Sequence, residues 1–215
     1  MILGDVGVGK TTFSLNIAQE IFNTKNSKVI FAYTRENTSK LIDRLIFSSE
    51  KDNSSFIPIF CSSFDNLLTE ILQFETYIAN EARYFKTCTY GAIIVDNIFE
   101  YYMLEIGTDT KNSLLNNKLN IMLATLNSIA ETYHIPVMIT NIPKSGQRFE
   151  QDSLKKFKNL DIVGFYGGSI VEYWISNIIK IERIGFLGAR NVIIFRENEN
   201  FKREFTAKIE NNGFI

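Results

Sequence analysis

The sequence predicts an α/β fold, with a mainly parallel sheet, helices on both of its faces and an antiparallel extension at the C-terminal end. Short apolar, β-branched runs alternate with longer amphipathic runs up to Thr140, as in strands joined by right-handed helical crossovers. Three more strand-like runs then follow with only turn-like segments between them. Because 45% of the 215 residues are apolar, the chain can bury one large core, and we expect residues 1–215 to form a single domain.

The first elements surround a glycine-rich loop. Met1–Leu3 supplies only the last residues of a strand, which leaves open whether an upstream part of that strand is missing. Apolar residues at helical spacing predict a helix over Thr11–Phe22, and the aromatic and β-branched run Lys28–Tyr33 predicts a buried strand. Helical spacing returns over Lys40–Phe47.

The later elements continue the alternation and then change character. In order, we expect a strand, a long amphipathic helix, a buried strand, a helix and a buried strand. A polar segment without periodicity follows, which predicts a functional or disordered loop, and three consecutive strands end the chain. These nine segments are Phe56–Cys61, Phe64–Phe85, Gly91–Val95, Leu114–Tyr133, Pro136–Thr140, Pro143–Phe165, Ile175–Ile184, Asn191–Arg196 and Phe205–Ile209.

Composition and charge bear on whether the chain binds nucleic acid, a metal cluster or a membrane. Lysine plus arginine (23) nearly balances aspartate plus glutamate (24), so a nucleic-acid site would have to be local. Cys61, Cys88 and His134 lack the spacing of metal ligands, and so few cysteines indicate a reducing compartment, which leads us to expect a cytoplasmic protein. No apolar run reaches the roughly 18 residues of a spanning helix, so we expect no membrane partner.

The loop after the first strand matches the phosphate-binding P-loop pattern G-x-x-x-x-G-K-T in full, between a strand end and a helix start. Glycines let the backbone wrap closely around phosphate, and the helix N-terminus adds positive partial charge. We expect Lys10 to reach the β- and γ-phosphates of ATP, and Thr11 to bind Mg²⁺. The residues expected to bind nucleotide here are Gly4, Asp5, Val6, Gly7, Val8, Gly9, Lys10, Thr11 and Thr12.

Two carboxylates complete the expected catalytic set with Lys10. Asp96 ends a buried strand at its carboxyl edge, where ligands bind in open α/β sheets, and is the expected second ligand of Mg²⁺. Glu36 lies just past the second strand, where it could activate the attacking water; helix capping or plain exposure to solvent explains it equally well. Thr140 and Asn141 end another strand at the level of the γ-phosphate and could report its presence, or could simply close the strand into a turn.

Basic and aromatic residues gather in the aperiodic loop. This combination is how proteins grip single-stranded nucleic acid, although a solvated charged loop would look the same. The candidate DNA-binding residues are Lys144, Arg148, Phe149, Lys155 and Lys156, with Phe157 and Lys158 close by.

The order of these motifs resembles the RecA/RadA recombinase superfamily over nearly the whole chain, and within it archaeal RadA paralogues such as RadB. The P-loop, the strand ending at Asp96, the long helix, the strand Val137–Asn141, the polar loop and the glycines Gly167 and Gly168 carry the likeness. The resemblance implies a RecA-like ATPase core. It also implies that Asp109 and Lys111 belong to a first DNA-binding loop and that Pro143–Phe165 is the second.

Three departures from the family pattern qualify this resemblance. The family has Glu directly after the strand-end Thr, whereas Arg35 follows Thr34 here and Glu36 comes one residue later. Ile142 stands where recombinases have a sensor Gln. The family's N-terminal DNA-binding domain and polymerisation linker are not in this sequence. We therefore expect weak hydrolysis and no full strand-exchange filament.

Two hypotheses follow from the sequence. In the first, the chain is a weakly hydrolysing recombinase paralogue that binds ATP, Mg²⁺ and single-stranded DNA and assists a recombinase in homologous recombination or DNA repair. In the second, it is a KaiC-like nucleotide-dependent switch that acts on a protein partner without DNA. Whether it forms a homo-oligomer is left open.

Overall fold

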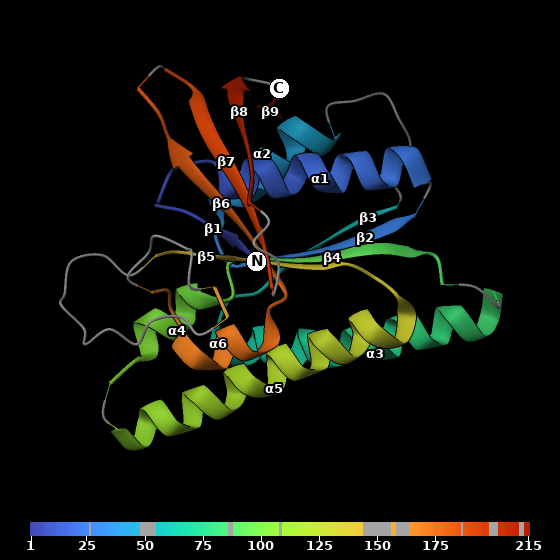
Figure 1. Cartoon of the computed structure of the whole chain (residues 1–215). Helices are drawn as coiled ribbons and strands as arrows, with labels where there is room; N and C mark the ends of the chain where they lie inside the picture. The colour runs from blue at the N-terminus through green and yellow to red at the C-terminus, as the bar shows by residue number, and fades with distance from the viewer. Residues whose placement is uncertain are drawn as a thin grey trace.

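The computed structural model describes residues 1–25, 27–47, 55–85, 88–107, 109–143, 156–157, 164–185, 187–197, 202–210 and 213–215. Within these ranges nine strands form one twisted sheet, with helices packed on both faces (Figure 1). None of the helices described is both long and apolar enough to cross a membrane.

The expected parallel sheet and antiparallel extension are both confirmed. The parallel strands are β1 (Ile2–Leu3), β2 (Lys28–Tyr33), β3 (Phe56–Phe60), β4 (Tyr90–Asp96), β5 (Val137–Asn141) and β6 (Asn177–Arg183). They are ordered β3-β2-β4-β5-β1-β6. The antiparallel strands β7 (Ala189–Arg196), β8 (Lys202–Glu210) and β9 (Gly213–Phe214) follow at the β6 edge. This order puts β1 beside β5 and makes it central, so the loop after β1 opens near the middle of the sheet.

One face of the sheet is covered by α1 (Lys10–Lys25) and α2 (Asn37–Ile42), which continues into a π-helical turn, η1 (Asp43–Phe47). The helix expected over Lys40–Phe47 therefore begins earlier and changes its hydrogen-bonding pattern midway. An apolar cluster joins Leu15 of α1 and Ile46 of η1 to Phe31 of β2. Burial of these side chains holds α1, and with it the P-loop, against the parallel strands.

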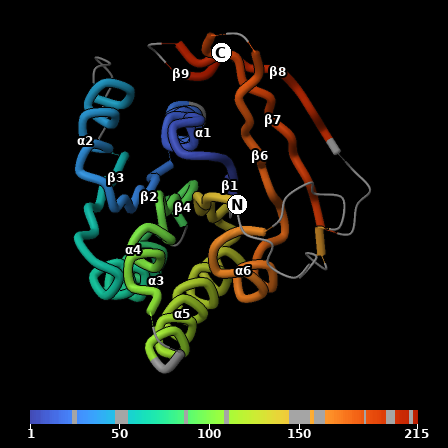
Figure 2. Tube along the Cα trace, turned by 90° about the vertical axis from the view of Figure 1, so that its left-hand side faces the viewer, coloured from blue at the N-terminus to red at the C-terminus, as the bar shows by residue number. Residues whose placement is uncertain are grey.

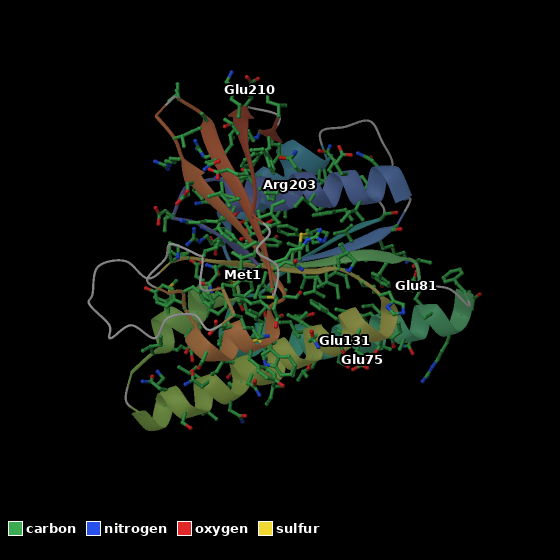
Figure 3. The ribbon with its side chains drawn as sticks, in the orientation of Figure 1. Met1, Glu75, Glu81, Glu131, Arg203 and Glu210 are labelled. Atoms are coloured by element: carbon green, nitrogen blue, oxygen red, sulfur yellow. The ribbon has the colours of Figure 1, made fainter. Side chains whose placement is uncertain are left out.

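In the described part of the chain, the opposite face carries two long helices and two short ones. The long helices α3 (Phe64–Phe85) and α5 (Asp109–Tyr133) bury their apolar stripes in the largest core cluster. The short helices α4 (Phe99–Glu105) and α6 (Gly168–Trp174) were not predicted, because seven residues give too few turns for a periodic signal. Figure 3 shows Glu75 and Glu131 on this helical layer, away from Met1 at the sheet.

The end of the chain returns to the first helix. Figure 2 shows β9 beside α1, although most of the sequence separates the two elements. The rings of Phe13 and Phe214 meet edge to face, with centroids 5.1 Å apart. The Phe214 N–H also donates to Asn16 Oδ1 at 2.9 Å. The C-terminal extension is thereby fastened to the helix that follows the P-loop.

Candidate nucleotide-binding site

The glycine loop lies between β1 and α1 and has no room for larger side chains. Gly7 and Gly9 have φ values of 72° and 108°, in the left-handed region that glycine tolerates. A Cβ on Gly4 would lie 2.5 Å from the Ile181 carbonyl oxygen of β6, so the backbones there are in close contact. The loop therefore has the shape that phosphate binding requires, with the N-terminus of α1 immediately after it.

The Lys10 side chain is buried and folds over the loop. Its Nζ donates to the carbonyl oxygens of Gly4 and Asp5, at 2.7 and 2.8 Å. Burial lowers the pKa of Lys10 to about 8, while the charge of Asp96 opposes this shift. Two neutral carbonyls are weak partners for an ammonium group, and phosphate oxygens would give it stronger, charge-assisted bonds.

Asp96 lies buried at the carboxyl end of β4, as predicted. Its Oδ1 accepts a hydrogen bond of 2.6 Å from the Thr140 hydroxyl of β5. Burial raises the pKa of Asp96, and hydrogen bonds from Thr11 and Thr140 together with the charge of Lys10 oppose that rise. The hydroxyl of Thr11 and this carboxylate are thus adjacent. They are the oxygen donors that Mg²⁺ takes from protein when phosphates and water supply the rest, so the donor set fits the metal.

Lys10, Thr11 and Asp96 line one cavity of about 230 Å³. Its walls are Val6, Gly7, Gly9, Lys10, Thr11, Thr12, Arg35, Leu41, Asp96, Asn97 and Ile142. Gly4 and Asp5 instead line a smaller neighbouring cavity, and Val8 packs into an apolar cluster with Ile2 and Ile181. A larger, mainly apolar cavity of about 370 Å³ between α5 and the sheet contains none of the predicted site residues.

Glu36, the expected catalytic base, does not line this cavity. Its side chain is exposed and makes no capping bond to α2, while its backbone oxygen accepts bonds from Ser39. Of the two alternative readings, exposure to solvent agrees with the structure and side-chain capping does not. The residue that faces the cavity from this segment is Arg35.

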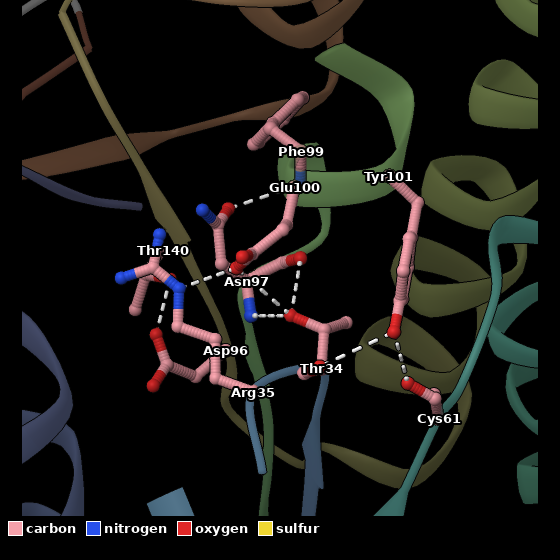
Figure 4. A network of polar contacts seen from close by, with 9 residues as sticks. All are labelled: Thr34, Arg35, Cys61, Asp96, Asn97, Phe99, Glu100, Tyr101 and Thr140. Carbon is pink, nitrogen blue, oxygen red and sulfur yellow. Dashed lines mark hydrogen bonds and ion pairs between the residues drawn. The ribbon is translucent and has the colours of Figure 1, made fainter. Parts of the chain in front are cut away.

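Arg35 belongs to a polar network that sequence reasoning missed (Figure 4). Its Nε lies 2.5 Å from Glu100 Oε2 on α4. The Thr34 hydroxyl lies 3.4 Å from the same oxygen and accepts a bond of 3.3 Å from the Asn97 N–H. The Tyr101 hydroxyl donates to the carbonyls of Thr34 and Cys61. The network joins the residues that directly follow β2, β3 and β4 to α4, beside the cavity, and no local motif could reveal it.

Asn141, expected to bind nucleotide, is committed to other contacts. Its Nδ2 donates to the Tyr166 carbonyl at 2.9 Å, and its Oδ1 accepts from the Ile142 N–H at 2.7 Å. The side chain closes the end of β5 and ties it to the segment before α6, which agrees with the turn alternative. Its neighbour Thr140 does reach the site, through the bond to Asp96.

Most of the expected DNA-binding segment lies outside the described residues. Lys144, Arg148, Phe149 and Lys155 lie outside the described residues, and so does Lys158. Pro143 and Phe165, which bound the segment, pair in an antiparallel bridge. The first expected DNA loop is not a loop at its start, because Asp109 and Lys111 belong to the first turn of α5.

Lys156 and Phe157, which are described and lie inside that segment, are held by the protein. Lys156 Nζ donates to the Tyr173 carbonyl at 2.9 Å and lies 3.1 Å from Glu197 Oε1. Its backbone N–H donates to Glu172 Oε1 at 2.7 Å. Phe157 is 4% exposed and packs in the main core, so it cannot stack on a base as its position in a basic loop suggested.

Two arginines, one on β6 and one on β7, brace the P-loop. Arg183 of β6 donates to the Gly7 carbonyl at 2.9 Å, and Arg190 of β7 donates through Nε to the Val8 carbonyl at 2.7 Å. Their partners are 176 and 182 residues away, so no sequence spacing could have indicated the contact. Burial lowers the pKa of Arg190, and the charge of Arg183 adds to this shift.

Comparison with known proteins places these features in a family. No family model matches the chain. The DNA repair and recombination protein RadB of Methanococcus maripaludis is 30% identical over 189 residues, covering 85% of this chain and 74% of that protein. RadB of Methanobrevibacter smithii is 26% identical over 225 residues, covering 100% and 86% of the two chains. RadB of Methanocaldococcus jannaschii is 29% identical over 189 residues, covering 85% and 77%. The chain therefore belongs to the RadB family, within the RecA/RadA superfamily that its motifs resemble.

Proposed function

We propose that this chain is an ATP- and Mg²⁺-binding protein of DNA repair and recombination, which hydrolyses ATP slowly and acts on single-stranded DNA. The observation that carries the nucleotide part is the meeting of Lys10, Thr11 and Asp96 at one cavity beside a complete P-loop. The names of the RadB relatives support the role in repair and recombination.

Each residue of the cavity has a distinct task in nucleotide binding. The Lys10 ammonium exchanges the carbonyls of Gly4 and Asp5 for phosphate oxygens, and the backbone amides at the start of α1 point toward the same anion. Thr11 and Asp96 hold the metal, and Thr140 orients Asp96. Bound Mg²⁺ would neutralise charge on the β- and γ-phosphates. Hydrolysis is slow because the exposed Glu36 carboxylate has to move to reach the cavity. Contacts of a catalytic base often tighten only when substrate is bound, so Glu36 stays our candidate base.

Calorimetry with Mg·ATP and Mg·ADP tests nucleotide binding. Lys10→Ala should abolish detectable binding of both nucleotides, because it removes the only lysine that lines the cavity in the described part of the chain. Lys40→Ala, which removes an exposed lysine of α2, is the matched control and should bind normally. Unchanged affinity in Lys10→Ala would refute the proposed site.

DNA binding is tested by fluorescence anisotropy with a labelled single strand at several salt concentrations. We propose that Lys144, Arg148 and Lys155 contact phosphates and that Phe149 stacks, which would contribute roughly 1–3 kcal/mol per base. The logarithm of affinity should fall with that of salt, with a slope of about 0.7 per neutralised phosphate. Removing the three basic residues should flatten this slope.

Lys156→Ala serves as the comparison within the same segment. Its ammonium is already paired with Glu197, so its removal should change the slope less than removal of any one of the other three. Binding without salt dependence, or binding that survives loss of all four charges, would favour the nucleotide-dependent switch that acts on a protein partner.

A further inference from the structure

We propose that Arg35 is a γ-phosphate ligand supplied by the chain itself, and that Glu100 holds it when no terminal phosphate is present. Arg35 would then make the site favour a nucleoside triphosphate over a diphosphate. This inference rests on the proposed nucleotide binding at the P-loop and adds a residue that discriminates between the two ligands.

The backbone places Arg35 at the carboxyl edge of the sheet, next to the strand that carries Asp96. Tyr33 of β2 is in register with Asp96 of β4, and the Thr34 N–H donates to the Asp96 carbonyl at 3.1 Å. Arg35 directly follows this anchored residue. It lines the same cavity as Lys10 and Thr11.

The charges of the cavity lining favour a triphosphate. Two cations, Arg35 and Lys10, line this small cavity together with the Asp96 carboxylate. A triphosphate brings enough negative charge to satisfy both cations, and its terminal phosphate is the part that a diphosphate lacks.

Glu100 is the group with which a phosphate would compete. It lies on α4 and contacts Arg35 through Nε alone, and among the described residues no other hydrogen bond of this guanidinium is found. The terminal NH₂ groups can therefore meet phosphate oxygens. The Arg35 side chain is 48% exposed and that of Glu100 is 25% exposed. Solvent therefore screens the attraction between the two charges, and breaking this ion pair costs little free energy. Figure 4 shows the Nε of Arg35 directed to Glu100.

Calorimetry of Mg·ATP and Mg·ADP binding to the wild-type protein and three variants tests the inference. Arg35→Ala should weaken ATP binding by roughly tenfold or more while changing ADP binding by less than about threefold, since a charge-assisted bond to one phosphate is lost. Glu100→Gln should strengthen ATP binding relative to ADP, because it removes the competing carboxylate. Arg83→Ala, at an exposed arginine of α3, is the matched control and should leave both affinities unchanged.

The double variant Arg35→Ala/Glu100→Gln separates this explanation from a change in folding. If Glu100 acts by holding Arg35, the gain from Glu100→Gln should vanish when Arg35 is absent. Arg35→Lys keeps the charge without the planar guanidinium and should bind ATP with intermediate affinity. That result would show that the protein tolerates a substitution at position 35.

The outcomes distinguish this inference from the function on which it rests. If the wild-type protein binds neither nucleotide, the proposed function fails. A second outcome is that Lys10→Ala abolishes binding, while Arg35→Ala lowers the affinities for ATP and ADP equally or leaves both unchanged. In that case the nucleotide site stands and the role of Arg35 is overturned.

Discussion

At the scale of single residues, the buried ammonium of Lys10 should make the proposed nucleotide binding sensitive to pH. Its pKa is lowered from 10.5 to about 8 by burial, so the protein without nucleotide loses this charge as pH rises through about 8. Phosphate binding requires the charged form. We expect the affinity for Mg·ADP to be constant below pH 7 and to fall by up to roughly tenfold per pH unit above 8, as measured by calorimetry.

Lys10→Arg provides the comparison for that pH profile. Arginine stays charged over the whole range, so any binding that this variant retains should vary little between pH 7 and 9.5. A wild-type affinity that is equally flat over this range would show that the ammonium is not depressed in pKa or does not contact the phosphates.

At the scale of elements, the P-loop depends on the two strands beside it. Arg190 of β7 holds the Val8 carbonyl, and Arg183 of β6 holds the Gly7 carbonyl. These bonds fix the loop before any ligand arrives, which lowers the ordering cost of binding. Arg190→Ala should therefore weaken Mg·ADP binding by about 1 kcal/mol, or roughly fivefold, in calorimetric titrations.

Arg183→Ala and Arg203→Ala complete that series. Arg183→Ala should show a smaller loss because its bond is exposed to solvent, and Arg203, which lies on β8 with an exposed side chain, should be neutral to within twofold or so. Full affinity in a folded Arg190→Ala protein would mean that the loop keeps its shape without the bond from Arg190 to Val8.

At the scale of the whole molecule, contacts between the two ends of the chain lead us to propose one cooperative unit. Phe214 of β9 packs on Phe13 of α1, and the single tryptophan, Trp174, lies on α6 at the opposite face of the sheet. Phe214→Ala should lower the free energy of unfolding by about 2 kcal/mol. In urea, the midpoint from Trp174 fluorescence should shift together with the midpoint from circular dichroism.

Phe205→Ala is the control for that experiment. Phe205 is 42% exposed on β8, so its loss should cost well under half as much as that of Phe214. A Trp174 transition that does not move in Phe214→Ala, while circular dichroism shows a separate early phase, would divide the chain into two independently folding parts.

The sequence by itself determined the elements whose signals are local. The P-loop pattern and the periodic runs predicted β2 and α3 with the bounds that the structure has, and Asp96 at the end of β4. Such features can be read because a helical stripe, an apolar run or a glycine turn depends on residues within a few turns of one another. The short helices α4 and α6 escaped prediction because they contain too few residues to show a period.

Only the tertiary structure decided which side chains meet at the site. The pairing of Arg35 with Glu100, the bracing of the P-loop by Arg183 and Arg190 and the burial of Phe157 join residues from separate elements. Asn141 and Glu36 stood at suggestive positions, yet one turns to Tyr166 and the other to solvent. The physical reason is that strand order and helix packing bring distant segments together. Distance and burial then decide which side chains become partners, and the local sequence determines neither the distance nor the burial.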